Sequence, residues 1–160
     1  MLTNRNIVVA MLVAPILSVI AWWAVGVFIG EKPKPAQPGR SYLLIEQSNC
    51  RYASGECDLE NADFKLTVSY LESASGPYLA VRSTHALDSM FMTVAYSGSE
   101  SPPKSMTSVG GHNTRWRMEV NSRPDLQARI RLVASAFGSA WFGDAGTRFL
   151  QPQADGYLQR

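Results

Sequence analysis

The two cysteines are the first residues whose types and spacing could do chemistry. Cys50 and Cys57 are the only cysteines in the chain, and a short stretch, RYASGE, separates them. Three uses are open: a disulfide, two free thiols or a metal site. A zinc site is disfavoured, because no second cysteine pair or close histidine accompanies them. We expect a disulfide, and disulfides persist in oxidising compartments such as the bacterial periplasm.

A second group of residues has the chemistry of a copper site. Thioether and imidazole ligands suit the cuprous ion, and neighbouring segments supply His85, Met90, Met92, Met106 and His112. The competing interpretation is packing, because Met90 and Met92 lie two apart and share one apolar face of an expected strand. We expect no cofactor and keep copper binding as the alternative.

Catalytic residues are not indicated by any pattern in the chain. No serine lies in a G-x-S-x-G turn, and the glycines of SVGGHN do not fall between a strand and a helix. The acids Asp58, Glu60 and Asp63 are expected in exposed turns. We therefore expect no enzyme and no small-molecule substrate. A formal charge of +2 with 18% charged residues gives no reason to expect nucleic acid as a partner.

Arginines alternate with apolar residues in two later segments, RWRMEV and LQARIRLVA. If these segments pair as a hairpin that turns through NSRPD, Arg115 faces Arg131 and Arg117 faces Arg129. Like charges directly opposed across a sheet are unfavourable. Either nearby acids balance a solvated face, or the arginines bind an acidic partner such as protein carboxylates or membrane lipid head groups.

The elements that must hold these residues begin with an apolar segment. Residues from Ile7 to Gly30 carry no charge, and as a helix they would reach about 36 Å, enough to cross a hydrocarbon core of about 30 Å. A secretory signal peptide is the alternative. Its apolar region is usually shorter and ends at a small-residue cleavage site, which VFIGEKPKPAQPGR does not offer. We predict one transmembrane helix.

Small residues recur on this segment four positions apart: Ala10, Ala14 and Ser18, then Gly26 and Gly30. In lipid, small residues let helix backbones approach closely, although they are also common in membrane spans by chance. Pro15 lacks an amide hydrogen and should bend the helix. We predict that these residues pack against an integral membrane protein complex.

Composition divides the chain into four parts. We predict a transmembrane helix in residues 1–30, a proline-rich linker in 31–40, a β-sandwich domain in 41–150 and a tail in 151–160. Alternating apolar and polar residues predict strands at 42–47, 64–70, 78–83, 90–96, 106–109, 115–120 and 126–134, with a final hairpin of 137–142 and 147–150 around GDAG. The predicted fold class is all-β, an immunoglobulin-like β-sandwich after one transmembrane helix.

Two signals about the location of the domain conflict. Arg5 precedes the apolar segment and Lys32, Lys34 and Arg40 follow it, which favours a cytoplasmic carboxyl-terminal domain. The expected disulfide favours the periplasm. We give the cysteines more weight and predict a single-pass protein of the bacterial inner membrane with its domain in the periplasm.

One membrane span, a short proline-bearing linker and a β-domain with a strand of the RWRMEV kind together resemble the FixH/CcoH-like proteins. Those are small membrane-anchored proteins associated with the assembly of cbb-type cytochrome oxidases. The cysteine pair departs from their pattern. The resemblance implies a non-catalytic accessory subunit or assembly factor of a respiratory membrane complex, and the alternative function is periplasmic copper handling.

Overall fold

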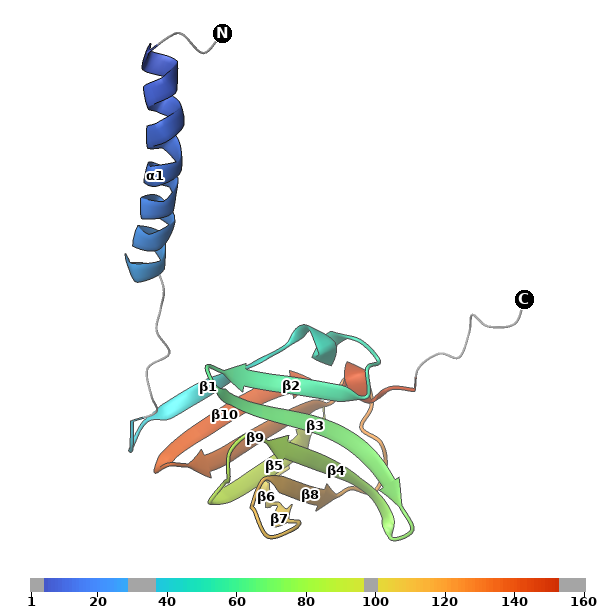
Figure 1. Ribbon diagram of the computed structural model, residues 1–160. Coiled ribbons are helices and arrows are strands. Elements are labelled where there is room, and N and C mark those ends of the chain that lie inside the picture. Colours follow the sequence, from blue (N-terminus) through green and yellow to red (C-terminus); the bar gives the residue numbers. More distant parts are fainter. Residues whose placement is uncertain (1–4, 29–36, 97–100, 153–160) are drawn as a thin grey trace, which may run out of the picture. The chain divides into compact units, whose positions relative to one another are not determined.

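The computed structural model describes residues 5–28, 37–96 and 101–152. The chain divides into two compact units, residues 1–34 and 35–160. A single helix, α1, lies in the first unit, and the second unit is built mainly of β-strands (Figure 1). The predicted all-β class of the domain is confirmed.

The helix α1 runs without interruption from Arg5 to Phe28 and includes Pro15. Apolar residues occupy nearly every position, so α1 has no polar face. Nearly all of its described side chains are exposed, among them Trp22 and Trp23 at 80% and 65%. In the part of the chain that the structure describes, no helix combines the length and apolar character needed to cross a membrane.

The strands of the second unit form two layers (Figure 1). The first layer contains β5 (Ser89–Ala95), β9 (Arg129–Ala136) and β10 (Ser139–Gly146). The second contains β2 (Glu56–Asn61), β3 (Phe64–Ser73), β4 (Gly76–Ser83) and β8 (Arg115–Glu119). Neighbouring strands within each layer are antiparallel.

Two segments join the layers. The first half of β1 (Ser41–Glu46) pairs in parallel with β10, and its second half pairs with β2. On the other side, β6 (Lys104–Ser105) pairs with β5, and β7 (Thr107–Ser108) pairs with β8. The strand order β6-β5-β9-β10-β1-β2-β3-β4-β8-β7 therefore begins and ends on neighbouring segments. The short strands β6 and β7 thus pair with edges of β5 and β8 that would otherwise be left open.

The core lies between the two layers and follows from the alternation of residue types. Phe64, Leu66 and Val68 on β3 are at most 1% exposed. Trp141 on β10 stacks on Phe64 with ring centroids 4.1 Å apart, and Tyr42 stacks on the same indole at 4.6 Å. Each fully buried side chain of this size stabilises the fold by about 1.5 to 3 kcal/mol.

The predicted final hairpin around GDAG is wrong. The turn lies earlier, at Phe137 and Gly138, whose φ angles of 54° and 70° suit a tight two-residue hairpin. Gly143 lies instead inside β10, where an added Cβ would come within 3.2 Å of Leu44. This glycine permits close packing, and residues 148–150 form the 3₁₀ helix η2.

The strand β2 was not predicted. Residues 56–61 were assigned to the cysteine loop and to exposed turn acids, but Cys57 and Leu59 are fully buried, and Asp58 and Glu60 are partly exposed on the outer face of the strand. Ala62, with a φ of 55°, makes the turn into β3. Of the predicted tail, 151–160, the structure describes residues 151 and 152, and residues 153–160 lie outside the described residues.

Candidate functional site

The four arginines that the sequence places on one hairpin face lie in different layers. The strand β8 pairs with β4 and β7, whereas β9 pairs with β5 and β10. The predicted pairs of Arg115 with Arg131 and of Arg117 with Arg129 are therefore wrong. The connection between β8 and β9 is too long for a tight turn, and Asp125 Oδ1 accepts the backbone N–H groups of Gln127 and Ala128 at 3.0 and 2.8 Å as the chain enters β9.

The arginines of β9 are matched by an acid on the neighbouring strand. Arg129 Nε donates to Asp144 Oδ1 at 2.8 Å, and Arg131 Nε lies 3.7 Å from Asp144 Oδ2. Asp144 faces Arg131 directly in the register of β9 and β10. These side chains are 42% to 51% exposed, so each pair contributes about 0 to 1 kcal/mol. Their main effect is to balance charge on this face.

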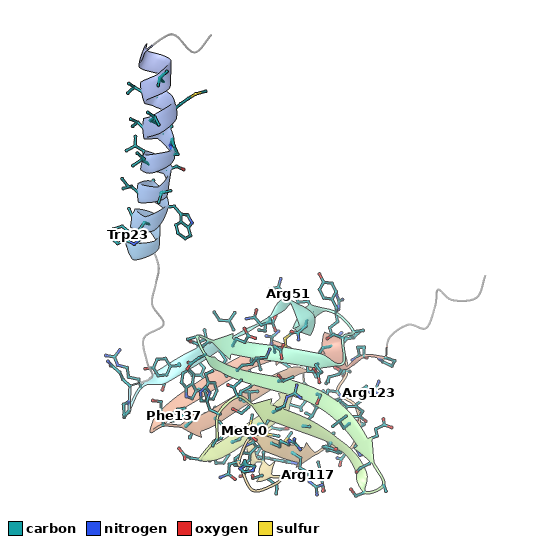
Figure 2. The ribbon with its side chains drawn as sticks, in the orientation of Figure 1. Trp23, Arg51, Met90, Arg117, Arg123 and Phe137 are labelled. Atoms are coloured by element: carbon teal, nitrogen blue, oxygen red, sulfur yellow. A yellow bond between two sulfur atoms is a disulfide. The ribbon has the colours of Figure 1, made fainter. Side chains whose placement is uncertain are left out.

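The arginines of β8 meet a third arginine that the sequence analysis missed. Arg82 on β4 lies directly opposite Arg115, and Arg117 lies opposite Ala80. Residues two apart on a strand share a face, so the three guanidinium groups project from the outer surface of the second layer, and all three residues are exposed. Figure 2 labels Arg117 where β8 runs.

The second layer carries acids on its outer face, but no described acid lies against Arg82 or Arg115 as Asp144 lies against Arg129. Among the residues described, Arg82 and Arg115 make no hydrogen bond or ion pair. Arg117 Nη2 lies 3.6 Å from Glu119 Oε1, but the glutamate side chain is 73% exposed. Because like charges opposed across strands are unfavourable, the pair of Arg82 and Arg115 lowers the stability of the isolated domain.

An open groove of about 630 Å³ follows the arginines across this face. Its lining includes Ser69, Leu71, Tyr78 and Val109 together with Arg82, Arg115 and Arg117. Glu56 is the only acidic residue among the lining residues. We call this feature the basic groove; it offers cationic, hydroxyl and apolar groups side by side.

The outer face of the first layer carries an apolar row instead. Leu43 faces Phe142, Phe142 faces Val133, and Val133 faces Phe91 across four neighbouring strands. These side chains are 40% to 53% exposed. They line a shallow hollow of about 530 Å³. Contiguous exposed apolar residues of this kind often mark contact with another molecule.

Cys50 and Cys57 form the predicted disulfide. The bond joins the 3₁₀ helix η1 (Ser48–Arg51) to the start of β2, and both residues are at most 2% exposed. Such a short cross-linked loop stabilises the folded state by about 2.5 kcal/mol through restriction of the unfolded chain. Neither thiol is left to bind a metal.

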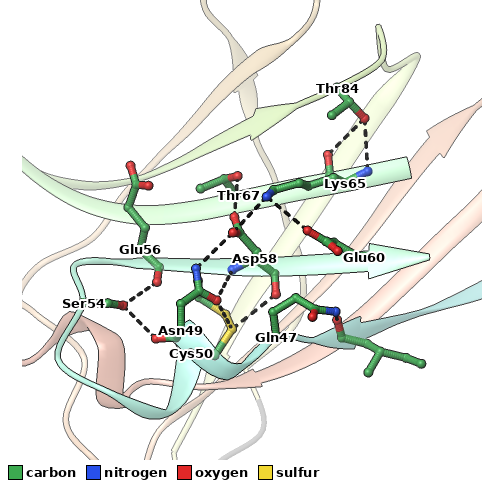
Figure 3. Close-up of polar contacts among 12 residues, drawn as sticks. Gln47, Asn49, Cys50, Ser54, Glu56, Asp58, Glu60, Lys65, Thr67 and Thr84 are labelled. Carbon is green, nitrogen blue, oxygen red and sulfur yellow. Dashed lines mark hydrogen bonds and ion pairs between the residues drawn. A yellow bond between two sulfur atoms is a disulfide. The ribbon is translucent and has the colours of Figure 1, made fainter. Parts of the chain in front are cut away.

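Asp58 is the centre of a polar cluster beside the disulfide (Figure 3). Its carboxylate accepts hydrogen bonds from Thr67 Oγ1 at 2.7 Å and Asn49 Nδ2 at 3.0 Å, and Lys65 Nζ lies 2.9 Å away. Burial raises the pKa of Asp58. The hydrogen bonds from Thr67, Lys65 and Asn49 and the charge of Lys65 together lower it by more, so the pKa lies below the usual value of 3.8. The hydrogen bonds to Asp58 and Glu60 raise the pKa of Lys65 above 10.5. The cluster fastens β2 to β3.

The proposed copper ligands occupy different environments. Met90, Met92 and Met106 are core residues, at most 4% exposed, whereas His112 is exposed in the turn after β7. His85 stacks on Phe64 at 5.8 Å, and its Nδ1 lies 3.0 Å from Thr84 Oγ1. The methionines therefore fill the core. Over the described ranges, no three His, Cys, Asp or Glu side chains gather as a metal site.

The structure describes most of the small residues of the apolar segment. Ala10, Ala14 and Ser18 are exposed on α1, and their spacing places them along one side of it. Gly26 is part of α1, and Gly30 lies outside the described residues. Packing of this side against another helix stays a prediction.

Comparison with protein-family models, curated proteins and solved structures found no match to this chain. The resemblance to the FixH/CcoH-like proteins therefore stays a prediction from the sequence. The chain's own features that bear on function are α1, the disulfide, the apolar row and the basic groove.

Proposed function

We propose that this protein is a non-catalytic, single-span accessory subunit or assembly factor of a bacterial inner-membrane complex. The observation that carries the proposal is α1, whose described side chains are almost all apolar and exposed. A helix that is apolar on every side normally lies inside a protein core or a bilayer. The proposed span is the uncharged segment from Ile7 to Gly30, which continues past the last residue of α1.

The disulfide supports a periplasmic location for the β-domain. Cys50 and Cys57 are bonded and buried, and such bonds are rare in reducing compartments. The lysines and arginine after the apolar segment favour the opposite orientation. We weight the disulfide more heavily, because it is part of the folded core.

The small residues of the apolar segment support association with an integral membrane subunit. Without a hydrophobic driving force between helices in lipid, association depends on close packing of small side chains. Ala10, Ala14 and Ser18 supply such a side. The FixH/CcoH resemblance makes a respiratory oxidase the first complex to test.

The β-domain is interpreted as immunoglobulin-like in its two-layer architecture. Support comes from the chain crossing between layers after β4 and after β8. The meander of β2, β3 and β4 differs from the ABED strand order of immunoglobulin domains. The interpretation therefore concerns the layers rather than the strand order.

Purification in mild detergent, followed by mass spectrometry of the proteins recovered with the full-length chain, tests the proposal. The expected result is recovery from the membrane fraction together with integral membrane subunits. Recovery from the soluble fraction without such subunits would overturn it. Copper measured in the same sample tests the copper-handling alternative, which requires metal bound in stoichiometric amount.

A further inference from the structure

The basic groove has the composition of a binding site for an acidic segment of protein. Three of its lining residues are arginines, from the adjacent strands β4 and β8, and one is a glutamate, Glu56. Its volume of about 630 Å³ falls within the range of about 300 to 1,000 Å³ typical of ligand sites. The groove is open to solvent and spans residues of β3, β4 and β8, so an extended chain could cross it.

Charge is the first reason to expect an acidic occupant. Arg82 and Arg115 oppose each other directly in register, and within the described residues neither has an acidic partner. A carboxylate placed between them would replace repulsion by two charge-assisted hydrogen-bonded pairs. Guanidinium groups bind carboxylates in a planar, two-bond geometry, which also fixes the orientation of the occupant.

The apolar lining is the second reason, and it favours a peptide over an ion. Leu71, Tyr78 and Val109 lie beside the guanidinium groups in the same groove. A free phosphate or a lipid head group makes no use of apolar side walls, whereas a peptide presents alternate side chains to both kinds of surface. The occupant therefore combines carboxylates with apolar side chains.

We infer that the basic groove binds an extended acidic segment of a partner protein, with its carboxylates on Arg82, Arg115 and Arg117. The inference rests on the proposed function, because it names the chemistry of the surface that an accessory subunit would recognise. The inference gives Arg82 a binding role that the sequence around Arg82 did not indicate.

A direct binding measurement tests the inference on the full-length chain in detergent. The probe is a fluorescein-labelled peptide that alternates glutamate and alanine around one tyrosine, and the matched probe has glutamine in place of glutamate. Fluorescence anisotropy should show binding about ten-fold or more tighter for the glutamate peptide. Raising NaCl from about 50 to about 300 mM should weaken it, because salt shortens the screening length.

Two variants separate the groove from general positive charge. The double substitution Arg82→Gln/Arg115→Gln should weaken glutamate-peptide binding about ten-fold or more. The double substitution Arg129→Gln/Arg131→Gln removes the same charge, two positive units, from the face where Asp144 lies between these arginines, so binding should stay within about two-fold. Circular dichroism of both variants establishes that they are folded.

Three results would overturn the inference: equal binding of the two peptides, an equal loss in both variants, or no peptide binding at all. A membrane occupant predicts something different, namely that vesicles containing phosphatidylglycerol bind the chain through Arg82 and Arg115 while the peptide does not. Co-purifying membrane subunits without peptide binding would reject the groove and keep the proposed function. Peptide binding without co-purifying membrane subunits would keep the groove as a binding site and reject the proposed function.

Discussion

The two outer faces of the β-domain both carry exposed arginines, yet their electrostatic surroundings are opposite. On the first layer, Arg129 lies 2.8 Å from Asp144 on the adjacent strand. On the second layer, Arg115 lies opposite Arg82. The residue type, the exposure and the alternating sequence are the same in both places. The difference is what the neighbouring strand places opposite, so the role of a surface arginine depends on pairing between distant segments.

The two faces also differ in how the layer beneath them is held. The second layer is fastened through β2 by the disulfide and by the Asp58 cluster. In the first layer, Gly143 lets β10 approach Leu44 on the neighbouring strand and, across the core, Leu59 on β2. Each of the following changes alters a residue of one layer, so each one tests the contrast.

Loss of the disulfide should have the largest effect. Replacing both Cys50 and Cys57 with alanine should lower the free energy of unfolding by about 2.5 kcal/mol, because the unfolded chain regains the freedom of the cross-linked loop. Urea unfolding measures the loss, and hydrogen exchange locates it. Exchange should rise first in β2 and only later in β9. Equal acceleration in both strands would mean that the bond does not act on the second layer in particular.

Gly143→Ala should disturb the first layer. The new Cβ would lie 3.2 Å from Leu44 Cβ and from Leu59 Cδ2, and the Leu44 atom is fixed to a strand paired with β10. Overpacking of this kind should lower the free energy of unfolding by about 1 to 2 kcal/mol.

Gly146→Ala is the matched control for that change, since an added Cβ there meets nothing within 4 Å. Chemical denaturation of the two variants gives the comparison. Equal stability of the alanine variants would show that β10 shifts freely and that close packing does not hold this layer.

Asp58→Asn should remove a pH-dependent contribution from the second layer. The pKa of Asp58 is lowered in the folded state, so its contribution is present above the usual value of 3.8 and is lost as pH falls through the folded pKa. The variant should be about 1 kcal/mol less stable than the parent chain at neutral pH. The difference should shrink below pH 3.8.

Urea midpoints measured across this acidic range check the Asp58 prediction. Glu60→Gln is the control, because Glu60 Oε1 lies 3.1 Å from the same Lys65 Nζ but does not accept the hydrogen bonds that Thr67 and Asn49 donate to Asp58. A constant difference between Asp58→Asn and the parent chain at every pH would show that the substitution acts through packing rather than through charge.

Much of the β-domain could be predicted from the sequence, because alternation is a local property. The alternation of arginines with apolar residues in RWRMEV is kept in β8, where Trp116 and Met118 are buried while Arg115 and Arg117 are exposed. The partner strand could not be predicted in the same way. The hairpin prediction paired β8 with the segment next in sequence. In the structure β8 pairs with β4, which lies earlier in the chain and is separated from β8 by β5, β6 and β7. Arg82 was missed for that reason.

Two other errors in the fold prediction have a similar origin. A glycine inside a strand and a glycine in a turn look alike in the sequence, and only the contact of Gly143 with Leu44 distinguishes them. The strand β2 was hidden because its outer face carries Glu56, Asp58 and Glu60, which resemble an exposed turn. The side chains that hydrogen-bond to Asp58 or neutralise its charge lie on β3 and η1.

The smallest effect is expected from exchanging the electrostatic character of the two faces. Arg115→Glu would place a carboxylate opposite Arg82, and a cross-strand pair of opposite charges should raise the free energy of unfolding by about 0.5 kcal/mol. Asp144→Asn removes the acid between Arg129 and Arg131 and should lower it by a similar amount, about 0.5 kcal/mol. Both effects on the free energy of unfolding should become smaller at high salt, because the charges are exposed.

Thermal or urea unfolding at low and high ionic strength shows whether each substitution raises or lowers the free energy of unfolding. If Arg115→Glu destabilised the chain, Arg82 and Arg115 would not repel each other in the folded state, and the contrast between the faces would be lost. If it stabilised the chain while abolishing glutamate-peptide binding, the repulsion would be a cost in stability that the basic groove carries for recognition. Opposed arginines would then mark a binding face on this domain, and arginines beside an acid would mark a face that is only solvated.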